Sequence, residues 1–173
     1  MKTIIVCKKI VLLLPLIAAA CFTCLASETG FKEARTLQRN GEYEAAIIAY
    51  KEYLTTPIEQ SKLKEKELFY YTEALVQLMN SFQSKGEAET CITALQEVYD
   101  ASPLLQNECL RDYYAVLGYA LSRTESMSEA EDTMLRVFTI PLYRATPERY
   151  FRDYAYAAAV FYSNPNYQKE VIG

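Results

Sequence analysis

The strongest constraint on the fold is a pattern of apolar residues that returns three times along the chain. In each copy, apolar side chains recur every three or four residues over two successive segments, which is the spacing of one face of an α-helix. A glycine or a polar turn separates the two segments, and a proline follows the second. The three copies end at Pro57, Pro103 and Pro141. The pattern predicts an all-α protein built from antiparallel helix pairs.

The first copy occupies residues 28–57. Its first segment, FKEARTLQRN, has apolar residues on one helical face, and either Ala34 or Ala46 is the small residue expected where the two helices cross. Gly41 is placed to end the first helix in the left-handed conformation that glycine adopts without strain. The apolar stripe of the second segment consists of Tyr43, Ala46, Ile47, Tyr50 and Leu54.

The third copy, residues 109–141, carries the most specific motif. Its residues are, in order, Tyr114, Leu117, Gly118, Leu121, Ala130, Met134 and Pro141. This order resembles the tetratricopeptide repeat, in which an aromatic residue, a Leu-Gly pair and a large apolar residue mark the first helix, and an alanine, a large residue and a proline mark the second. In the same copy, Ser126 followed by Glu129 has the spacing of a capping box.

The resemblance extends over most of the chain. It divides the sequence into units at about 28–57, 61–103 and 109–141, with an incomplete unit at 146–173. Corresponding positions on the first helices lie 45, 39 and 40 residues apart, whereas the standard repeat has ~34, so the extra length is expected in the links. Tyr53, Met79 and Val137 also depart from the small residues of the family. The resemblance implies a tetratricopeptide-like α-solenoid of antiparallel helix hairpins.

A binding surface follows from the family geometry. The first helices of such units line a concave face, which usually binds an extended peptide or a partner helix. The side chains that the resemblance places on this face are Arg35, Arg39, Asn80, Gln83, Tyr119, Arg123, Arg152 and Tyr162. Several are arginines on an acidic protein, so an acidic or carboxylate-ended peptide would suit them. The alternative is an ordinary solvated helix surface.

The N-terminal residues have the order of a secretory signal peptide. Lys8 and Lys9 precede an uncharged apolar run over residues 10–25, and small residues follow. As an uncleaved helix this run would reach only ~24 Å at ~1.5 Å per residue, which is short of a ~30 Å hydrocarbon core. We therefore predict a signal peptide at residues 1–26 that is cut after Ala26.

The predicted location is outside the cytoplasm. An exported protein would be periplasmic or associated with the cell envelope, with a single helical repeat domain at residues 27–173. Two alternatives remain, namely lipoprotein processing at Cys21 and an anchor formed by the uncleaved N-terminal segment. Membrane contact is expected only through the signal segment or such a lipid anchor.

Composition excludes several classes of function. The chain has no histidine, which removes the common nucleophile–imidazole pairs, imidazole bases and histidine metal sites. Removing residues 1–26 takes away three of the 18 basic residues and none of the 22 acidic ones, which leaves a net charge of −7. A chain of this charge is not expected to bind nucleic acid. The remaining cysteines, Cys91 and Cys109, are expected to be separate thiols rather than a disulfide, although export would permit one.

Two short motifs invite a catalytic or metal-binding interpretation. Ser61 and Lys64 form an S-x-x-K, the nucleophile motif of penicillin-interacting enzymes, but its companion motifs are missing. Glu129, Glu131 and Asp132 are acidic neighbours, yet they fall in a predicted first helical turn, where acidic side chains are favoured by the helix dipole. We therefore predict no catalytic residue, no cofactor and no metal site.

The predicted function is a non-catalytic exported module that binds a protein or peptide partner in the cell envelope. The alternative is the N-terminal sensory region, or a fragment, of a two-component sensor kinase or related signalling protein, which such exported repeats also resemble. In either case Thr146 and Pro147 are expected to start a last helix, on which Tyr154, Ala158 and Phe161 take the family positions of a first helix. This helix is apolar on most sides, so we expect an uncovered patch and self-association through it, or a longer protein.

Overall fold

The computed structural model describes residues 26–58 and 63–164. Within these ranges the secondary structure is helical without strands, which confirms the all-α prediction. The predicted signal segment lies outside the described residues except for Ala26, the first residue of the first described helix. Ser61 and the expected continuation of the last unit after residue 164 also lie outside them.

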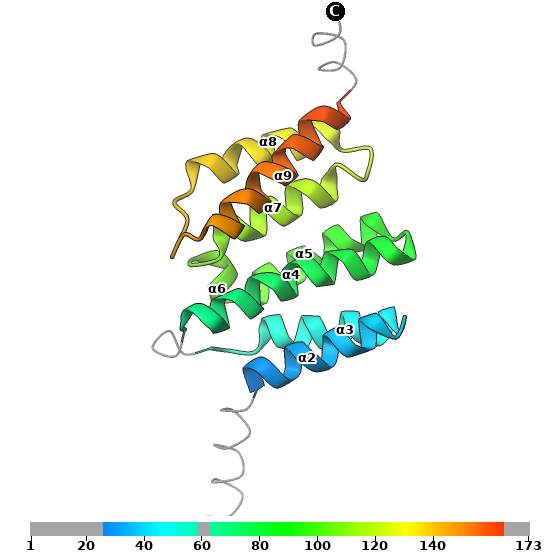
Figure 1. The fold of residues 1–173 in the computed structure, drawn as a ribbon. Coiled ribbons are helices and arrows are strands. Elements are labelled where there is room, and N and C mark those ends of the chain that lie inside the picture. The colour runs from blue at the N-terminus through cyan, green and yellow to red at the C-terminus, as the bar shows by residue number, and fades with distance from the viewer. Residues whose placement is uncertain (1–25, 59–62, 165–173) are drawn as a thin grey trace, which may run out of the picture.

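The described helices follow one another with short connections. They are α2 (Ala26–Arg39), α3 (Tyr43–Thr55), α4 (Glu65–Lys85), α5 (Ala88–Ala101), α6 (Pro103–Gln106), α7 (Leu110–Leu121), α8 (Met127–Thr139) and α9 (Pro147–Ser163). Figure 1 shows them in layers, with α2 and α3 at one end, α4 and α5 in the middle, and α7, α8 and α9 at the other end. Between layers, α4 packs on α2 and α3, and α7 packs on α4 and α5, while α9 covers α7 and α8.

The turns inside two helix pairs depend on glycine. Gly41 and Gly86 have φ angles of 82° and 74°, the left-handed region in which a side chain is strained. After each glycine the chain satisfies a helix-terminal carbonyl: the Glu42 N–H donates to the Leu37 carbonyl at 3.0 Å, and the Glu87 N–H to the Phe82 carbonyl at 3.1 Å. The prediction that Gly41 ends the first helix in a left-handed cap is therefore confirmed.

Three of the helices end shortly before a proline. Helices α3 and α8 end two residues before Pro57 and Pro141, as expected, because the residue before a proline avoids the helical conformation. Helix α5 likewise ends two residues before Pro103, which is also the first residue of the short helix α6, a position that tolerates its missing N–H.

The predicted capping box at α8 is wrong. Ser126 is the N-cap residue, but its side chain makes no capping hydrogen bond. Its backbone has ψ of 44° rather than the extended value that directs a capping hydroxyl toward the helix. Instead, the Ser126 N–H donates to the Thr124 hydroxyl at 3.1 Å. At α9, by contrast, the Thr146 hydroxyl accepts a hydrogen bond from the Arg149 N–H, so the predicted Thr146-Pro147 helix start is confirmed.

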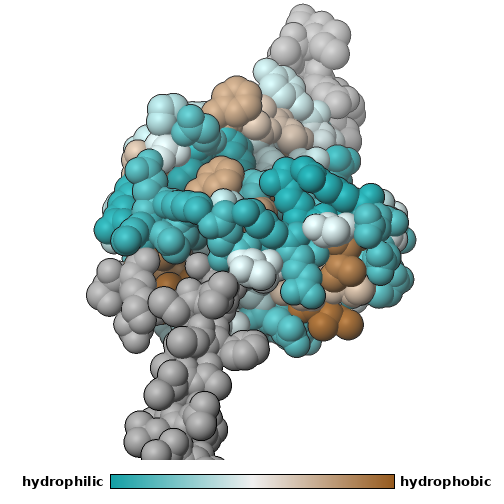
Figure 2. Space-filling view, turned by 60° about the horizontal axis from the view of Figure 1, so that its bottom comes forward, coloured by the Kyte–Doolittle hydropathy of each residue, from teal (hydrophilic) through white to brown (hydrophobic). Residues whose placement is uncertain are grey.

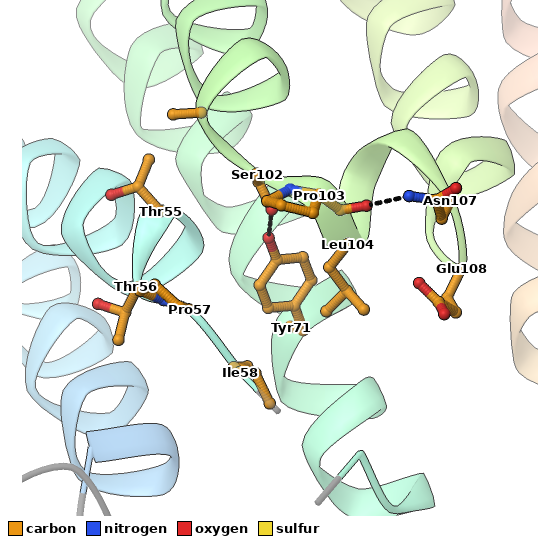
Figure 3. Close-up of a pocket in the computed structure, with 11 residues that line it drawn as sticks. Thr55, Thr56, Pro57, Ile58, Tyr71, Ser102, Pro103, Leu104, Asn107 and Glu108 are labelled. Carbon is orange, nitrogen blue, oxygen red and sulfur yellow. Dashed lines mark hydrogen bonds between the residues drawn. The ribbon is translucent and has the colours of Figure 1, made fainter. Parts of the chain in front are cut away.

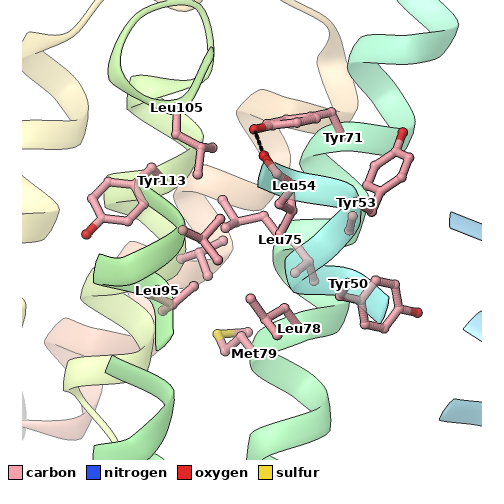
Figure 4. Close-up of a cluster of buried hydrophobic side chains, with 14 of the residues drawn as sticks. Tyr50, Tyr53, Leu54, Tyr71, Leu75, Leu78, Met79, Leu95, Leu105 and Tyr113 are labelled. Carbon is pink, nitrogen blue, oxygen red and sulfur yellow. Dashed lines mark hydrogen bonds between the residues drawn. The ribbon is translucent and has the colours of Figure 1, made fainter. Parts of the chain in front are cut away.

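The buried side chains form two clusters that share α7. The larger one runs from α2 to α7, and Figure 4 shows its tyrosines and leucines converging between α3, α4, α5 and α7. Within it the Tyr71 hydroxyl donates to the Leu54 carbonyl at 2.6 Å. Helix α7 contributes Tyr113 and Val116 to this cluster, and Ala115 and Leu121 to the smaller cluster between α7, α8 and α9.

The small residues at the helix crossings and the two free thiols agree with the predictions from the sequence. Ala34 and Ala46 are both fully buried where α2 meets α3. A Cβ added at Gly118 would lie 3.4 Å from the Ala130 carbonyl oxygen, so the glycine lets α7 approach α8 closely. Cys91 and Cys109 are buried free thiols, as expected.

Candidate partner-binding groove

A groove opens between the first turns of α4 and the first turns of α9. It encloses a cavity of about 790 Å³, with one wall from residues 64–73 and the other from residues 146–152. The α4 wall presents the apolar ring of Phe69, which is 55% exposed, beside Tyr70. The opposite wall presents Arg149 and Arg152. We call this feature the α4–α9 groove.

A buried ion network lies beneath the α9 wall of the groove. The Asp112 carboxylate of α7 is fully buried and accepts hydrogen bonds from two arginines of α9. Arg149 Nε lies 3.0 Å from Asp112 Oδ1, and Arg152 donates to the same carboxylate. In the reverse direction, Arg111 of α7 donates to Asp153 of α9 at 2.7 Å. These pairs fasten α9 to α7 by charge-assisted hydrogen bonds.

The network carries an excess of positive charge. It holds three guanidinium groups against two carboxylates, those of Asp112 and Asp153. Burial raises the pKa of Asp153, and the hydrogen bond from Arg111 partly offsets this shift. Two of its buried atoms, Arg152 Nε and Asp153 Oδ1, have no hydrogen-bond partner among the described residues. The groove lining above it is mixed in charge, with four basic side chains (Lys64, Lys66, Arg149 and Arg152) and three acidic ones (Glu65, Glu73 and Glu148).

The surface continues from the groove along α7 and α9. Tyr119 of α7 stacks on Tyr156 of α9, with ring centroids 4.7 Å apart and planes inclined by 12°. Arg123 donates to the Tyr119 hydroxyl at 2.8 Å and lies 5.1 Å from the centre of its ring. Burial raises the pKa of Tyr156 to about 12, while Arg152 lowers it and Tyr119 and Glu73 add to the rise. The ring stack joins α7 to α9, and Glu73, which lines the groove from α4, is near enough to Tyr156 to influence its pKa.

The predicted residues on α2 and α4 form a second group. Arg35 lies 5.9 Å from the centre of the Phe31 ring, and Arg39 is exposed. Asn80 of α4 donates weakly to the Gln77 side chain at 3.5 Å. The buried Nε2 of Gln83 has no hydrogen-bond partner among the described residues.

The structure therefore divides the predicted binding residues. Tyr119, Arg123 and Arg152 belong to the surface that includes the α4–α9 groove, although Arg152 is half-buried and already paired with Asp112. Tyr162 is 68% exposed, but it lies six residues after Tyr156, about 120° around the helix at ~3.6 residues per turn. It faces away from the Tyr119–Tyr156 stack.

Sequence reasoning missed Phe69 and the ion network. Phe69 belongs to an apolar run in the sequence, which offers no sign that its ring points outward. The network has a visible signal, since Arg111-Asp112 and Arg152-Asp153 are the same dipeptide on two helices. Predicting ion pairs between the two dipeptides requires knowing that α9 lies against α7, and the spacing of residues in the sequence does not show this.

A second cavity lies where α3 ends beside α6. It encloses about 580 Å³ and is lined by the α3 end, Tyr71, residues 101–104, Asn107 and Glu108 (Figure 3). The Tyr71 and Ser102 side chains form a hydrogen bond with each other, and the Asn107 amide donates to the Pro103 carbonyl at 2.8 Å. Because these polar groups already satisfy one another, we assign no ligand to this cavity.

Two negative findings concern the described residues alone. Over residues 26–58 and 63–164, no helix has the length and apolar character needed to cross a bilayer. In the same ranges, no group of three or more acidic or cysteine side chains is arranged to hold a metal ion. Glu131, one of the acidic neighbours at the start of α8, instead accepts a hydrogen bond from Asn164.

Comparisons of the chain with protein-family models, with curated proteins and with solved structures find no match.

Proposed function

We propose that this protein is a non-catalytic module of tetratricopeptide type, an α-solenoid of helix hairpins, that binds a protein or peptide partner in the cell envelope. The order of contacts supports the architecture, because α2 pairs with α3, α7 pairs with α8, and each later layer begins with a helix that packs on the layer before it. The N-terminal signal pattern supports export.

The α4–α9 groove is the observation that carries the binding proposal. Its volume of about 790 Å³ suits several peptide side chains. The exposed Phe69 ring offers apolar contact area, and aromatic residues are enriched in the centres of binding interfaces. The lining carries four basic side chains against three acidic ones, and the network beneath it holds three guanidinium groups against two carboxylates. This small local excess of positive charge favours an acidic peptide or a free C-terminal carboxylate.

A peptide-binding assay with two surface variants tests the proposal. The probes are acidic peptides with a free C-terminal carboxylate and the same peptides ending in an amide, measured by fluorescence anisotropy. Phe69→Asp should weaken binding at least tenfold, and Arg123→Glu, next to the Tyr119–Tyr156 stack, should weaken it to a smaller extent. Both are exposed positions, so circular dichroism should stay unchanged.

The matched control is Arg136→Glu, an exposed arginine of α8 away from the groove. It changes the net charge as Arg123→Glu does, so it separates a local effect from the overall field. If the folded Phe69→Asp variant binds every peptide that the wild type binds, with equal affinity, the groove is not the site. The sensory-region alternative remains a prediction from the sequence.

A further inference from the structure

An exposed aromatic face covers the α8–α9 end of the protein. On α9, Phe151 is 75% exposed and Tyr154 is 61% exposed. On α8, Leu135 is 57% exposed and Phe138 is 41% exposed. The rings of Phe138 and Tyr154 lie 5.5 Å apart, so the side chains of the two helices form one continuous surface. We call it the α8–α9 outer face.

The opposite end of the protein has a different character. In Figure 2 the end formed by α2 and α3 is turned toward the viewer, and its visible surface is mostly hydrophilic. Lys32, Glu33 and Thr36 are among the exposed residues of α2, and Ile48 of α3 is 61% exposed. A head-to-tail contact would set the aromatic face against this mainly polar end, which is a poorer match than a second copy of the aromatic face.

The exposed side of α9 is self-complementary. Phe151, Ala155, Ala158 and Tyr162 follow one another at spacings of four, three and four residues, and all are exposed. These spacings place them in one row along the helix. The side chains of this row are large, small, small and large in turn, so their sizes read the same in either direction along the helix. In an antiparallel pair of these helices, each large side chain therefore faces a large one, and each alanine faces an alanine.

We propose that the α8–α9 outer face joins two copies of this chain in a two-fold symmetric dimer, with α9 antiparallel to its counterpart. Phe151 then lies against the partner's Tyr162, and Ala155 lies against the partner's Ala158. Because the two central layers contain only alanine, the helix axes can approach to the short end of the usual ~8–10 Å separation. The antiparallel orientation also sets each helix N-terminus beside a C-terminus of opposite partial charge.

The charge of the row is compatible with a second copy as the occupant, and the area of the face sets the expected affinity. The row of four residues contains no charged side chain, so the acidic net charge of the chain is not concentrated at the contact. Helix α9 has 17 residues, or ~25 Å of length, and a face two helices wide covers ~500 Å². That is below the ~800 Å² per partner of a standard interface, so a weak dimer with a micromolar dissociation constant is expected.

This surface is distinct from the α4–α9 groove. The groove uses Arg149 and Arg152 on another side of α9, and those two side chains are half-buried or buried against α7. Dimerisation therefore goes beyond the proposed peptide binding. Ala158→Arg should leave peptide affinity unchanged, which distinguishes failure of one proposal from failure of the other.

Sedimentation velocity of the purified full chain over roughly two decades of concentration tests the dimer. The wild type should shift from monomer to dimer, and Ala158→Arg should raise the dissociation constant more than tenfold with unchanged helicity. Thr36→Arg on the exposed face of α2 is the control and should dimerise as the wild type does. A wild type that stays monomeric, as it would if residues 165–173 covered the face, overturns the proposal, and so does an Ala158→Arg variant that dimerises normally.

Disulfide trapping tests the orientation. The starting chain has serine in place of Cys7, Cys21 and Cys24. Chains carrying Ala155→Cys and chains carrying Ala158→Cys are then mixed under mild oxidation. The antiparallel arrangement predicts that the mixed disulfide forms faster than either like-with-like disulfide, since the two positions face each other. Dominant like-with-like disulfides would overturn the antiparallel packing.

Discussion

Asp112 accepts hydrogen bonds from one buried and one half-buried arginine, so its replacement should lower the free energy of unfolding substantially. Asp112→Ala leaves Arg149 and Arg152 without the carboxylate that both contact. Removing one partner of a buried ion pair costs about 3–5 kcal/mol of unfolding free energy. The Arg149 side chain is only 7% exposed, whereas that of Arg152 is 16% exposed and regains water more easily. We therefore expect a loss of about 3–4 kcal/mol, in the lower part of that range.

Urea denaturation followed by circular dichroism at neutral pH measures this loss. The midpoint should fall while the dependence on urea concentration stays the same, because the surface exposed on unfolding is unchanged. The control is Glu97→Ala, which removes an exposed partner of Lys51 and should cost below about 1 kcal/mol. The triple variant Asp112→Leu, Arg149→Met and Arg152→Met should recover much of the loss, since it removes all three charges together. An Asp112→Ala variant within 1 kcal/mol of the wild type would refute the reasoning.

Three further predictions concern backbone, thiols and pH. Gly86→Ala should cost about 1 kcal/mol, because φ is 74° there, whereas Gly30→Ala inside α2 should be neutral or stabilising in the same thermal melts. Cys91 and Cys109 should resist iodoacetamide until the protein unfolds, because burial raises the pKa of both thiols, that of Cys91 to about 12. Burial also raises the pKa of Asp153 above its ordinary 3.8, so its contribution to the unfolding free energy should grow as pH falls through the raised value, and Asp153→Asn should remove that dependence in urea titrations from neutral to acidic pH.

Local features of the fold were predictable, and contacts between layers were not. Gly41 and Thr146 act within a few residues of their own positions, so sequence spacing alone located the turn and the helix start. The capping box at Ser126 failed because the Thr124 hydroxyl, only two residues away, accepts the hydrogen bond of the Ser126 N–H. In a capping box that N–H would donate to the Glu129 side chain.

The binding surface was predictable only in part for the same reason. Tyr119 and Arg123 are four residues apart on one helix, and their contact follows from helical periodicity. Arg111 and Asp153 are 42 residues apart, and their pairing depends on how α9 settles on α7. The sequence pattern predicts Arg152 on a peptide-binding face. In the structure, the packing of α9 on α7 places its guanidinium group in an ion pair with Asp112.

The division of the core at α7 has a consequence for affinity. Because α8 and α9 bury most of their apolar residues in the smaller cluster, we expect this layer to open locally at a lower free-energy cost than global unfolding. In that partly open state the groove would lose the wall that α9 forms. The measured dissociation constant of a groove ligand then equals the intrinsic constant divided by the fraction of molecules with the last layer closed. Solution conditions that loosen the last layer would thus weaken binding without altering any residue that touches the ligand.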